Sequence, residues 1–288
     1  MNTEATAVQT APGVGDSASF ERHLSLSALP ESWKNWKKEY WEKYEELPFP
    51  RTRDEHWRFA SRIDFDLSGF QLAEDASDDT IEEVLSRSNL VAERSGQIVF
   101  VDNQLVSEEA IPEELAARGV VFLPLAEAVT KHPELVERYL FQESTDLGSD
   151  KFHALHNAYS ESGYLLYVPD NVEIDAPFAV YHWHAAPGAA LFPHILVVGG
   201  RNSRFSVVDA QQSLFEDRTG FSCAVGSVFA EDGAKIYRRT ILTTGWSPSS
   251  SIPTMSTGIP QCEGSISTWE AVALDLRTRC GSMGLEPM

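Results

Sequence analysis

Histidines on one predicted strand are the side chains in this sequence with the clearest capacity for metal chemistry. His182 and His184 flank Trp183, so they point to the same face of an extended strand. Imidazole is a common zinc ligand, and His194 could supply a third one. No carboxylate stands beside them at a recognisable ligand spacing. We therefore expect an exposed or hydrogen-bonded strand face without a metal, and a metal site is the alternative.

A second pair of histidines and three cysteines could also carry chemistry. His153 and His156 lie one turn apart on a predicted helix. As for the strand histidines, we expect them to bind no metal, and a metal site is the alternative. Cys223, Cys262 and Cys280 are widely spaced and include no Cys-x-x-Cys pair, which excludes a disulfide framework and a self-contained zinc or iron-sulfur ligand set. Cys223 lies in an apolar run, where we expect a small buried residue, and a role in handling sulfur is the alternative.

Carboxylates and a glycine pair complete the candidates. Asp209, Glu216 and Asp217 could pair as acid and base in a carbohydrate-cleaving β-helix. Acidic residues are so common at the turns of this chain that we expect no such pairing. Gly199-Gly200 has no helix after it, so we expect a corner between strands and no phosphate loop. The sequence thus predicts no catalytic residue and no metal ligand, and it assigns no cofactor-binding residue.

Short strands in the middle of the chain must position these residues. Runs rich in Val, Ile, Phe and Tyr end at breakers, and turns at Pro169, Gly199 and Asp232 lie roughly thirty residues apart. A solenoid that makes one circuit per repeat has this spacing, and a two-sheet sandwich remains open. The expected strands are Tyr164–Val168, Phe178–His184, His194–Val198, Arg204–Asp209 and Ser222–Ala230.

The first half of the chain predicts a helical and small α/β region. Glu31–Glu46 places Trp and Tyr side chains at helical intervals, and we expect this aromatic face to pack on its own domain, with a partner surface as the alternative. Asp78 or Asp79 would cap a helix over 79–86. The other expected elements are helices Leu125–Val129, Pro133–Phe141 and Lys151–Tyr159 and strands Gln97–Asp102 and Val120–Leu123.

Composition restricts the partners and the compartment. The 288 residues include 23 Lys plus Arg against 43 Asp plus Glu, and a net charge of -20 argues against nucleic acid. No apolar run approaches the roughly 20 residues that cross a bilayer, and Met1–Phe20 lacks the features of a secretory signal. We expect a cytoplasmic protein with no membrane partner.

Several motifs resemble the SufB/SufD family of iron-sulfur cluster assembly proteins. Asp150–Ala158 (DKFHALHNA) resembles the family's Lys-Phe-x-Ala-Leu-x-x-Ala helix. Ser162–Pro169 (SGYLLYVP) resembles a family segment in which a Gly precedes a strand that ends in Val-Pro. Ile174–Pro177 resembles the family segment in which a Pro opens the next strand. The Trp-rich helix and Glu55–Arg58 resemble the amino-terminal region of the SufD members in particular. The resemblance runs from about Leu29 to about Ile241.

The resemblance implies an α+β, mainly β fold, in which a helical and small α/β region precedes a right-handed parallel β-helix. It implies a non-enzymatic scaffold subunit of a cytoplasmic SUF complex, which acts through interfaces with a SufB-like scaffold subunit and a SufC-like ATPase. No cofactor is then bound by this chain alone, because the cluster is assembled on the complex. The rival prediction is a metal-dependent or polysaccharide-acting β-helix or β-barrel enzyme. The expected regions are a disordered 1–20, an amino-terminal domain 21–149, a β-helix core 150–244 and a tail 245–288.

The tail departs from the family pattern. From Gly245 to Met288 the sequence loses strand alternation, whereas the family would continue with more β-helix and a helical carboxy-terminal domain, so the resemblance predicts a truncated chain. Reading the back-translated codons of Ile266–Ala271 from their third base permits Leu-Asn-Leu-Gly-Gly, which resembles the family's next core motif. We hypothesise a frameshift between about Thr240 and Pro253 that makes the tail foreign to the fold.

Overall fold

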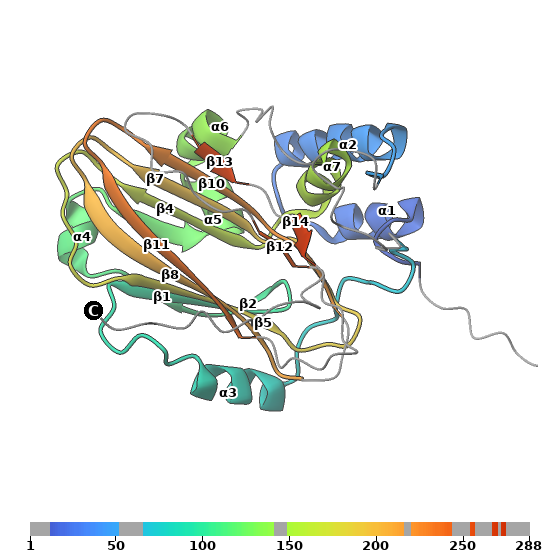
Figure 1. The fold of residues 1–288 in the computed structure, drawn as a ribbon, viewed down its shortest axis with the longest axis horizontal. Helices are drawn as coiled ribbons and strands as arrows, with labels where there is room; N and C mark the ends of the chain where they lie inside the picture. Colours follow the sequence, from blue (N-terminus) through green and yellow to red (C-terminus); the bar gives the residue numbers. More distant parts are fainter. Residues whose placement is uncertain are drawn as a thin grey trace, which may run out of the picture.

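A computed structural model describes residues 12–51, 66–140, 149–215 and 220–243, together with three short strands at 254–256, 267–269 and 272–274. Three β-sheets form its middle, and helices lie beside and below them (Figure 1). None of the helices in these ranges is long and apolar enough to cross a membrane. The α+β class that the sequence predicted is confirmed.

Three helices pack together through aromatic side chains: α1 (Ser17–Leu26), α2 (Glu31–Glu46) and α7 (Asp150–Tyr159). Helix α1 begins after Asp16, whose carboxylate accepts a hydrogen bond from the amide of Ala18 at 2.8 Å. Phe20 stacks on Trp41 with ring centroids 4.6 Å apart, so the aromatic face of α2 is buried within the chain as expected. The expectation of disorder is wrong for residues 12–20, because Val14 is fully buried and Ser17–Phe20 belong to α1, and residues 1–11 lie outside the described residues.

Three further helices cover two of the sheets from outside. The first sheet is covered by α3 (Asp78–Arg87), where Val84 packs among Val99 and Trp183. Helices α5 (Leu125–Lys131) and α6 (Pro133–Leu140) pack on the outer side of the second sheet, and α4 (Glu113–Ala117) is a single short turn. The cap of α3 is Ser77, whose hydroxyl accepts from the amide of Thr80, and neither Asp78 nor Asp79 fills that position.

The three sheets are defined by their strand orders. The first sheet is β11 (Lys235–Thr243), β8 (Arg204–Ser213), β5 (Phe178–His184), β1 (Gly96–Val101) and β2 (Gln104–Glu109). The second is β13 (Ser267–Trp269), β10 (Val225–Ala230), β7 (His194–Gly199), β4 (Gly163–Val168) and β3 (Val121–Pro124). The third is β14 (Val272–Leu274), β12 (Thr254–Ser256), β9 (Phe221–Cys223) and β6 (Ala190–Leu191).

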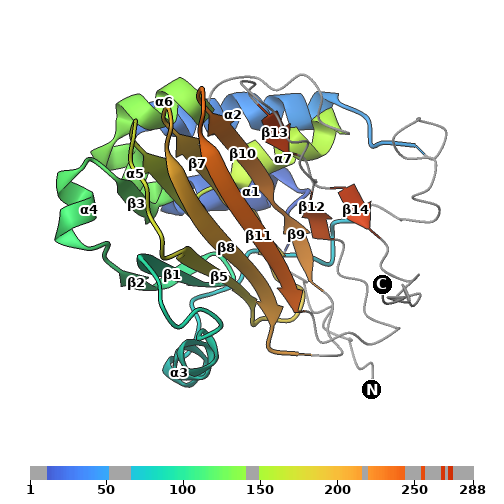
Figure 2. The same ribbon diagram turned by 60° about the vertical axis from the view of Figure 1, so that its left-hand side comes forward.

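From β4 to β12, successive strands visit the second, first and third sheets in a repeating order, so each of β7 to β12 pairs in parallel with the strand three places earlier. The short strands β13 and β14 pair antiparallel with β10 and β12. Gly163 aligns with His194 and His194 with Val225, an offset of 31 residues each time. The same offset aligns Arg204 with Lys235. Figure 2 shows the long strands β5, β8 and β11 running side by side in the first sheet.

The corner between the second and first sheets repeats with the same offset. Asn171, Asn202 and Gly233 have φ of 59°, 56° and 73°, a left-handed conformation that Asn and Gly adopt more readily than other residues. The side-chain amide of Asn202 donates to the Oδ1 of Asn171 at 3.1 Å. A Cβ on Gly233 would lie 2.4 Å from the Oδ1 of Asn202, so a larger residue there would have to displace the Asn202 side chain.

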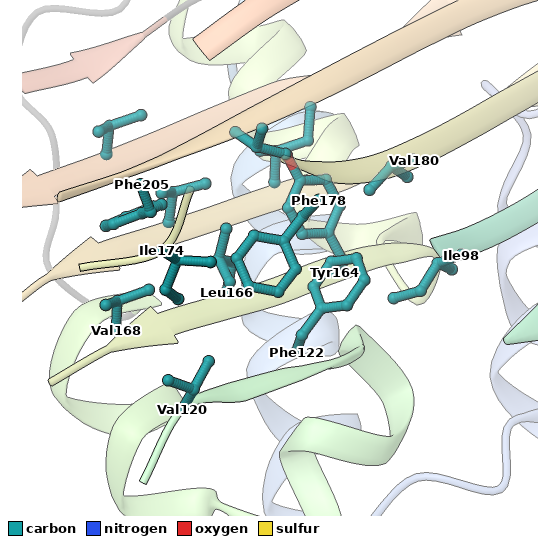
Figure 3. Close-up of a cluster of buried hydrophobic side chains, with 14 of the residues drawn as sticks. Ile98, Val120, Phe122, Tyr164, Leu166, Val168, Ile174, Phe178, Val180 and Phe205 are labelled. Atoms are coloured by element: carbon teal, nitrogen blue, oxygen red, sulfur yellow. The ribbon is translucent and has the colours of Figure 1, made fainter. Parts of the chain in front are cut away.

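Alternating residues of the first and second sheets fill the space between them. Figure 3 shows Phe178 and Val180 from β5 beside Tyr164 and Leu166 from β4, with Ile98 from β1 at one side. Successive strand side chains point to opposite faces, so the intervening residues pack outward against the helices. This interior cluster is the core that holds the two sheets together.

The observed strands differ from the predicted ones in two ways. The expected strand Ser222–Ala230 is two strands, β9 and β10, because the chain passes from the third sheet to the second at Ala224. Strands β1 and β3, which precede the expected boundary at residue 149/150, pair with β5 and β4, which follow it. Strands β2, β6 and β11 were not predicted. Glu55–Arg58 and most of the tail lie outside the described residues.

Candidate functional site

His182 and His184 lie on one face of β5 as predicted, but that face is the inner one. His182 is 1% exposed and stacks on Phe100 with ring centroids 5.1 Å apart. Burial lowers the pKa of each of the two histidines to about 4, so both are neutral at pH 7. Neither ring nitrogen of His182 has a hydrogen-bond partner among the described residues. The expectation of an exposed or hydrogen-bonded face is wrong because β5 is a central strand enclosed on both faces.

His194 lies on a different sheet and faces helix α7, so it does not join the β5 histidines. Its Nδ1 is 3.0 Å from the Nε2 of His156, whose own Nδ1 is 2.7 Å from the carbonyl oxygen of Cys223. That carbonyl can only accept, so His156 donates to it and accepts from His194. The remaining nitrogen of His194 then accepts from the hydroxyl of Ser227 at 3.5 Å.

Burial lowers the pKa of His156 to about 3 and that of His194 well below its usual range. The two neutral rings therefore form one hydrogen-bonded chain that ties α7 to β7, to β10 and to the corner after β9. Because every ring nitrogen of the two histidines has a hydrogen-bond partner, this network attaches the helix to the sheet and leaves no ring nitrogen to bind a ligand.

His153 does not share this site, although it lies on the same helix. Its Nε2 accepts from the side-chain amide of Asn157 at 3.0 Å, and its ring meets the edge of Tyr40. Cys223 is buried as expected, and its Sγ donates to the carbonyl of Phe152 at 3.5 Å. Among the residues that the structure describes, no three His, Cys, Asp or Glu side chains are grouped as a metal site would require. Cys262 and Cys280 lie outside those residues.

Asp209 is held in an interior ion pair. Its Oδ2 accepts from the Nε of Arg238 at 2.7 Å and from the hydroxyl of Tyr164 at 2.9 Å, and its side chain is fully buried. Its partners are thus a cation and a phenol, which hold the carboxylate as a structural anion. Glu216 and Asp217, the other two acids of the alternative interpretation, lie outside the described residues.

Sequence reasoning missed two cations that reach the interior, Lys37 and Arg238. Lys37 is fully buried on α2, where its Nζ lies 3.0 Å from Glu161 and 3.0 Å from the Nε2 of His23. Burial lowers the pKa of Lys37 to about 8 despite the attraction of Glu161. Lys37 stands between the aromatic residues of Glu31–Glu46 in the sequence, and only the docking of α1 and α7 encloses its side chain. Arg238 was missed because its strand, β11, was not predicted.

Gly199-Gly200 forms a corner, as expected. A Cβ on Gly200 would lie 2.5 Å from the Oδ1 of Asp170, and the amide of Arg201 donates to that same oxygen at 2.8 Å. The next element is β8 and not a helix. A pocket of about 400 Å³ opens elsewhere, between α2 and the α5–α6 pair, and is lined by Trp33, Trp36 and Val136 among others.

Comparison with known proteins identifies relatives by sequence. Residues 25–180 match the family model described as the SufBD protein N-terminal region. The iron-sulfur cluster assembly protein SufD of Bacillus subtilis is 26% identical over 207 residues, which are 70% of this chain and 46% of that protein. An iron-sulfur cluster assembly SufBD family protein of Guillardia theta is 30% identical over 45% of this chain and 26% of its own length. One of Pyrococcus horikoshii is 24% identical over 51% of this chain and 32% of its own length. The chain therefore spans less than half the length of these curated relatives.

Proposed function

Because this chain belongs to the SufBD family, we propose that it acts as a SufD-like scaffold subunit in iron-sulfur cluster assembly. The observation that carries the proposal is the family match over residues 25–180, which takes in α2, α7 and the first strands of the circuits. The alignment with a protein named SufD over 70% of the chain supports the SufD-like assignment.

The proposal includes the finer architecture. The repeating order of sheets and the 31-residue offset support a right-handed parallel β-helix, carried by residues 150–244 behind an amino-terminal region 21–149. Stacked circuits give a scaffold a long rigid surface, since every backbone group of an inner strand is paired with the circuits on either side.

A scaffold of this kind acts through its interfaces and not through a reaction centre. The histidines that could have bound a metal are used for packing or for hydrogen bonds to their neighbours, and Asp209 is used in an ion pair. We propose that the partners are a SufB-like subunit and a SufC-like ATPase in the cytoplasm, with the cluster built on the complex and no cofactor bound by this chain alone.

Co-elution tests the proposal. The full chain is mixed with the SufB-like and SufC-like proteins of the same organism and passed through a sizing column, with an unrelated protein of similar size and charge as the control. We expect the chain to move into an earlier fraction with both partners while the control does not. Elution of a folded chain at its own position, apart from both partners, would contradict the scaffold role.

A further inference from the structure

The outer face of the last long strand carries a cationic strip on an otherwise acidic protein. In β11, Ile236 packs on the interior cluster and Arg238 reaches Asp209 inside, so the alternate residues Lys235, Tyr237 and Arg239 point outward. Tyr237 is 59% exposed, and both cations beside it are exposed. In Figure 2, β8 and β11 lie at the front, and no described helix lies over them.

Three cations surround Tyr237. Arg204 of β8 is exposed and stands directly opposite Lys235 in the parallel register, which places like charges next to each other. Its ion pair with Glu173, at 3.7 Å between exposed groups, neutralises it only weakly. Among the described residues, the side chains of Lys235 and Arg239 form no ion pair.

The outward residues of the two strands include no acid. Those of β8 are Arg204, Ser206, Val208 and Ala210, and those of β11 are Lys235, Tyr237, Arg239 and Ile241. The chain has a net charge of -20, yet on this face Arg204 and Lys235 stand opposite each other. The repulsion between these two cations is unfavourable unless an anion neutralises it. Arg and Tyr are also the residue types enriched in protein interfaces.

We propose that this cationic strip, Arg204, Lys235, Tyr237 and Arg239, binds an acidic segment of a partner protein. Carboxylates of the segment would pair with the three cations, and an apolar or planar side chain would cover the ring of Tyr237. A protein segment fits better than nucleic acid because its few carboxylates need only this strip, whereas a long polyanion would meet the repulsion of the surrounding acidic surface. The inference stands on the charges of this face and does not depend on the scaffold role.

Binding of a labelled acidic peptide to the full chain tests the strip. The probe is a short Glu- and Asp-rich peptide that contains one Phe, compared with its Gln and Asn counterpart and with a thymidine oligonucleotide of the same charge. Fluorescence anisotropy at low and high salt gives the affinities, and zero-length crosslinking of carboxylates to lysine followed by mass spectrometry locates the site.

A matched pair of variants separates this strip from the overall charge. Lys235→Glu with Arg239→Glu removes the strip, whereas Arg22→Glu with Arg118→Glu makes the same change in net charge at exposed positions on other elements. We expect the first variant to weaken peptide binding about tenfold or more and the second to change it little. Tyr237→Ala is expected to weaken binding several-fold without changing the salt dependence, and the crosslink is expected at Lys235.

Several results would overturn the inference. These are equal losses in the two charge-reversal variants, equal binding of the neutral peptide, a crosslink at other lysines only, or no peptide binding at all. Tighter binding of the oligonucleotide than of the peptide would assign the strip to nucleic acid instead. Earlier elution of the wild-type chain alone, lost in the strip variant, would assign it to a second copy of this chain. Circular dichroism of each variant verifies that the fold is retained.

Discussion

The interior ion pair between Asp209 and Arg238 allows a sharp test of what holds the last circuit in place. Replacing Arg238 by Met removes the guanidinium that donates to Asp209 at 2.7 Å and leaves a fully buried carboxylate with Tyr164 as its remaining hydrogen-bond donor. Arg238 itself is only 11% exposed at its side chain, so water does not readily replace it. The variant therefore keeps the cost of burying the charge and loses its compensation.

The expected loss of stability is large. Breaking a buried ion pair from one side costs about 3–5 kcal/mol. At about 2–4 °C per kcal/mol for a protein of this size, the melting temperature of Arg238→Met should fall by roughly 6–20 °C. Thermal unfolding followed by circular dichroism at pH 7 measures this fall.

Two comparison variants make the test specific. Arg239→Met is the same substitution at the next residue, which is exposed on the other face, and it should change stability by less than about 0.5 kcal/mol. Adding Asp209→Leu to Arg238→Met removes the stranded carboxylate and should restore much of the loss. Equal melting temperatures for Arg238→Met and Arg239→Met would refute the reasoning.

Further predictions concern pH, helix capping and the tail. Burial lowers the pKa of His182 to about 4, so below pH 6.5 unfolding takes up a proton at this residue, and the free energy of unfolding falls as the pH is lowered from 6.5 to 4. His182→Leu should reduce that fall by about 1.4 kcal/mol per pH unit, as measured by urea titrations. Asp102 has the opposite effect on the pH dependence of stability, because burial raises its pKa to about 6 and its contribution to the free energy of unfolding is lost as the pH rises from about 4 to 6. Asp102→Asn removes this loss, so the free energy of unfolding should rise more steeply with pH between about 4 and 6. Lys151→Met should cost about 1–3 kcal/mol in urea unfolding, since the ammonium group donates to the carbonyls of Tyr44 and Leu47 at the end of α2, whereas the exposed Lys38→Met should cost little. The nucleotide sequence of the gene tests the frameshift: the shifted frame should yield alternating strand residues, and an immediate stop codon would exclude it.

Local patterns predicted individual elements well. The helix Glu31–Glu46 and the strand Phe178–His184 were predicted with the boundaries observed, because aromatic spacing and flanking prolines define both in the sequence. The division of Ser222–Ala230 into two strands depends on the change of sheet at Ala224, and the pairing of circuits sets this change without any local breaker. Strand β6 is only Ala190–Leu191, too short for any alternation to show.

The environments of the candidate residues were less predictable than their positions. The two-residue spacing placed His182 and His184 on one face but could not say that this face is the inner one, since only the neighbouring strands decide that. The contact between His156 and His194 joins a helix to a strand 38 residues later, and no spacing rule relates the two. No prediction was made for Arg238, whose carboxylate partner Asp209 lies on the adjacent strand 29 residues earlier.

The stacked corners at Asn171, Asn202 and Gly233 limit how this chain can change in length. A single residue inserted within a strand would turn the apolar side chains that follow it in that strand to the opposite face of the sheet. A whole circuit of 31 residues could be duplicated or removed with far less disturbance, because each corner would meet an equivalent one. Insertion or deletion of a complete circuit should therefore be tolerated more readily than insertion or deletion of a single residue within a strand.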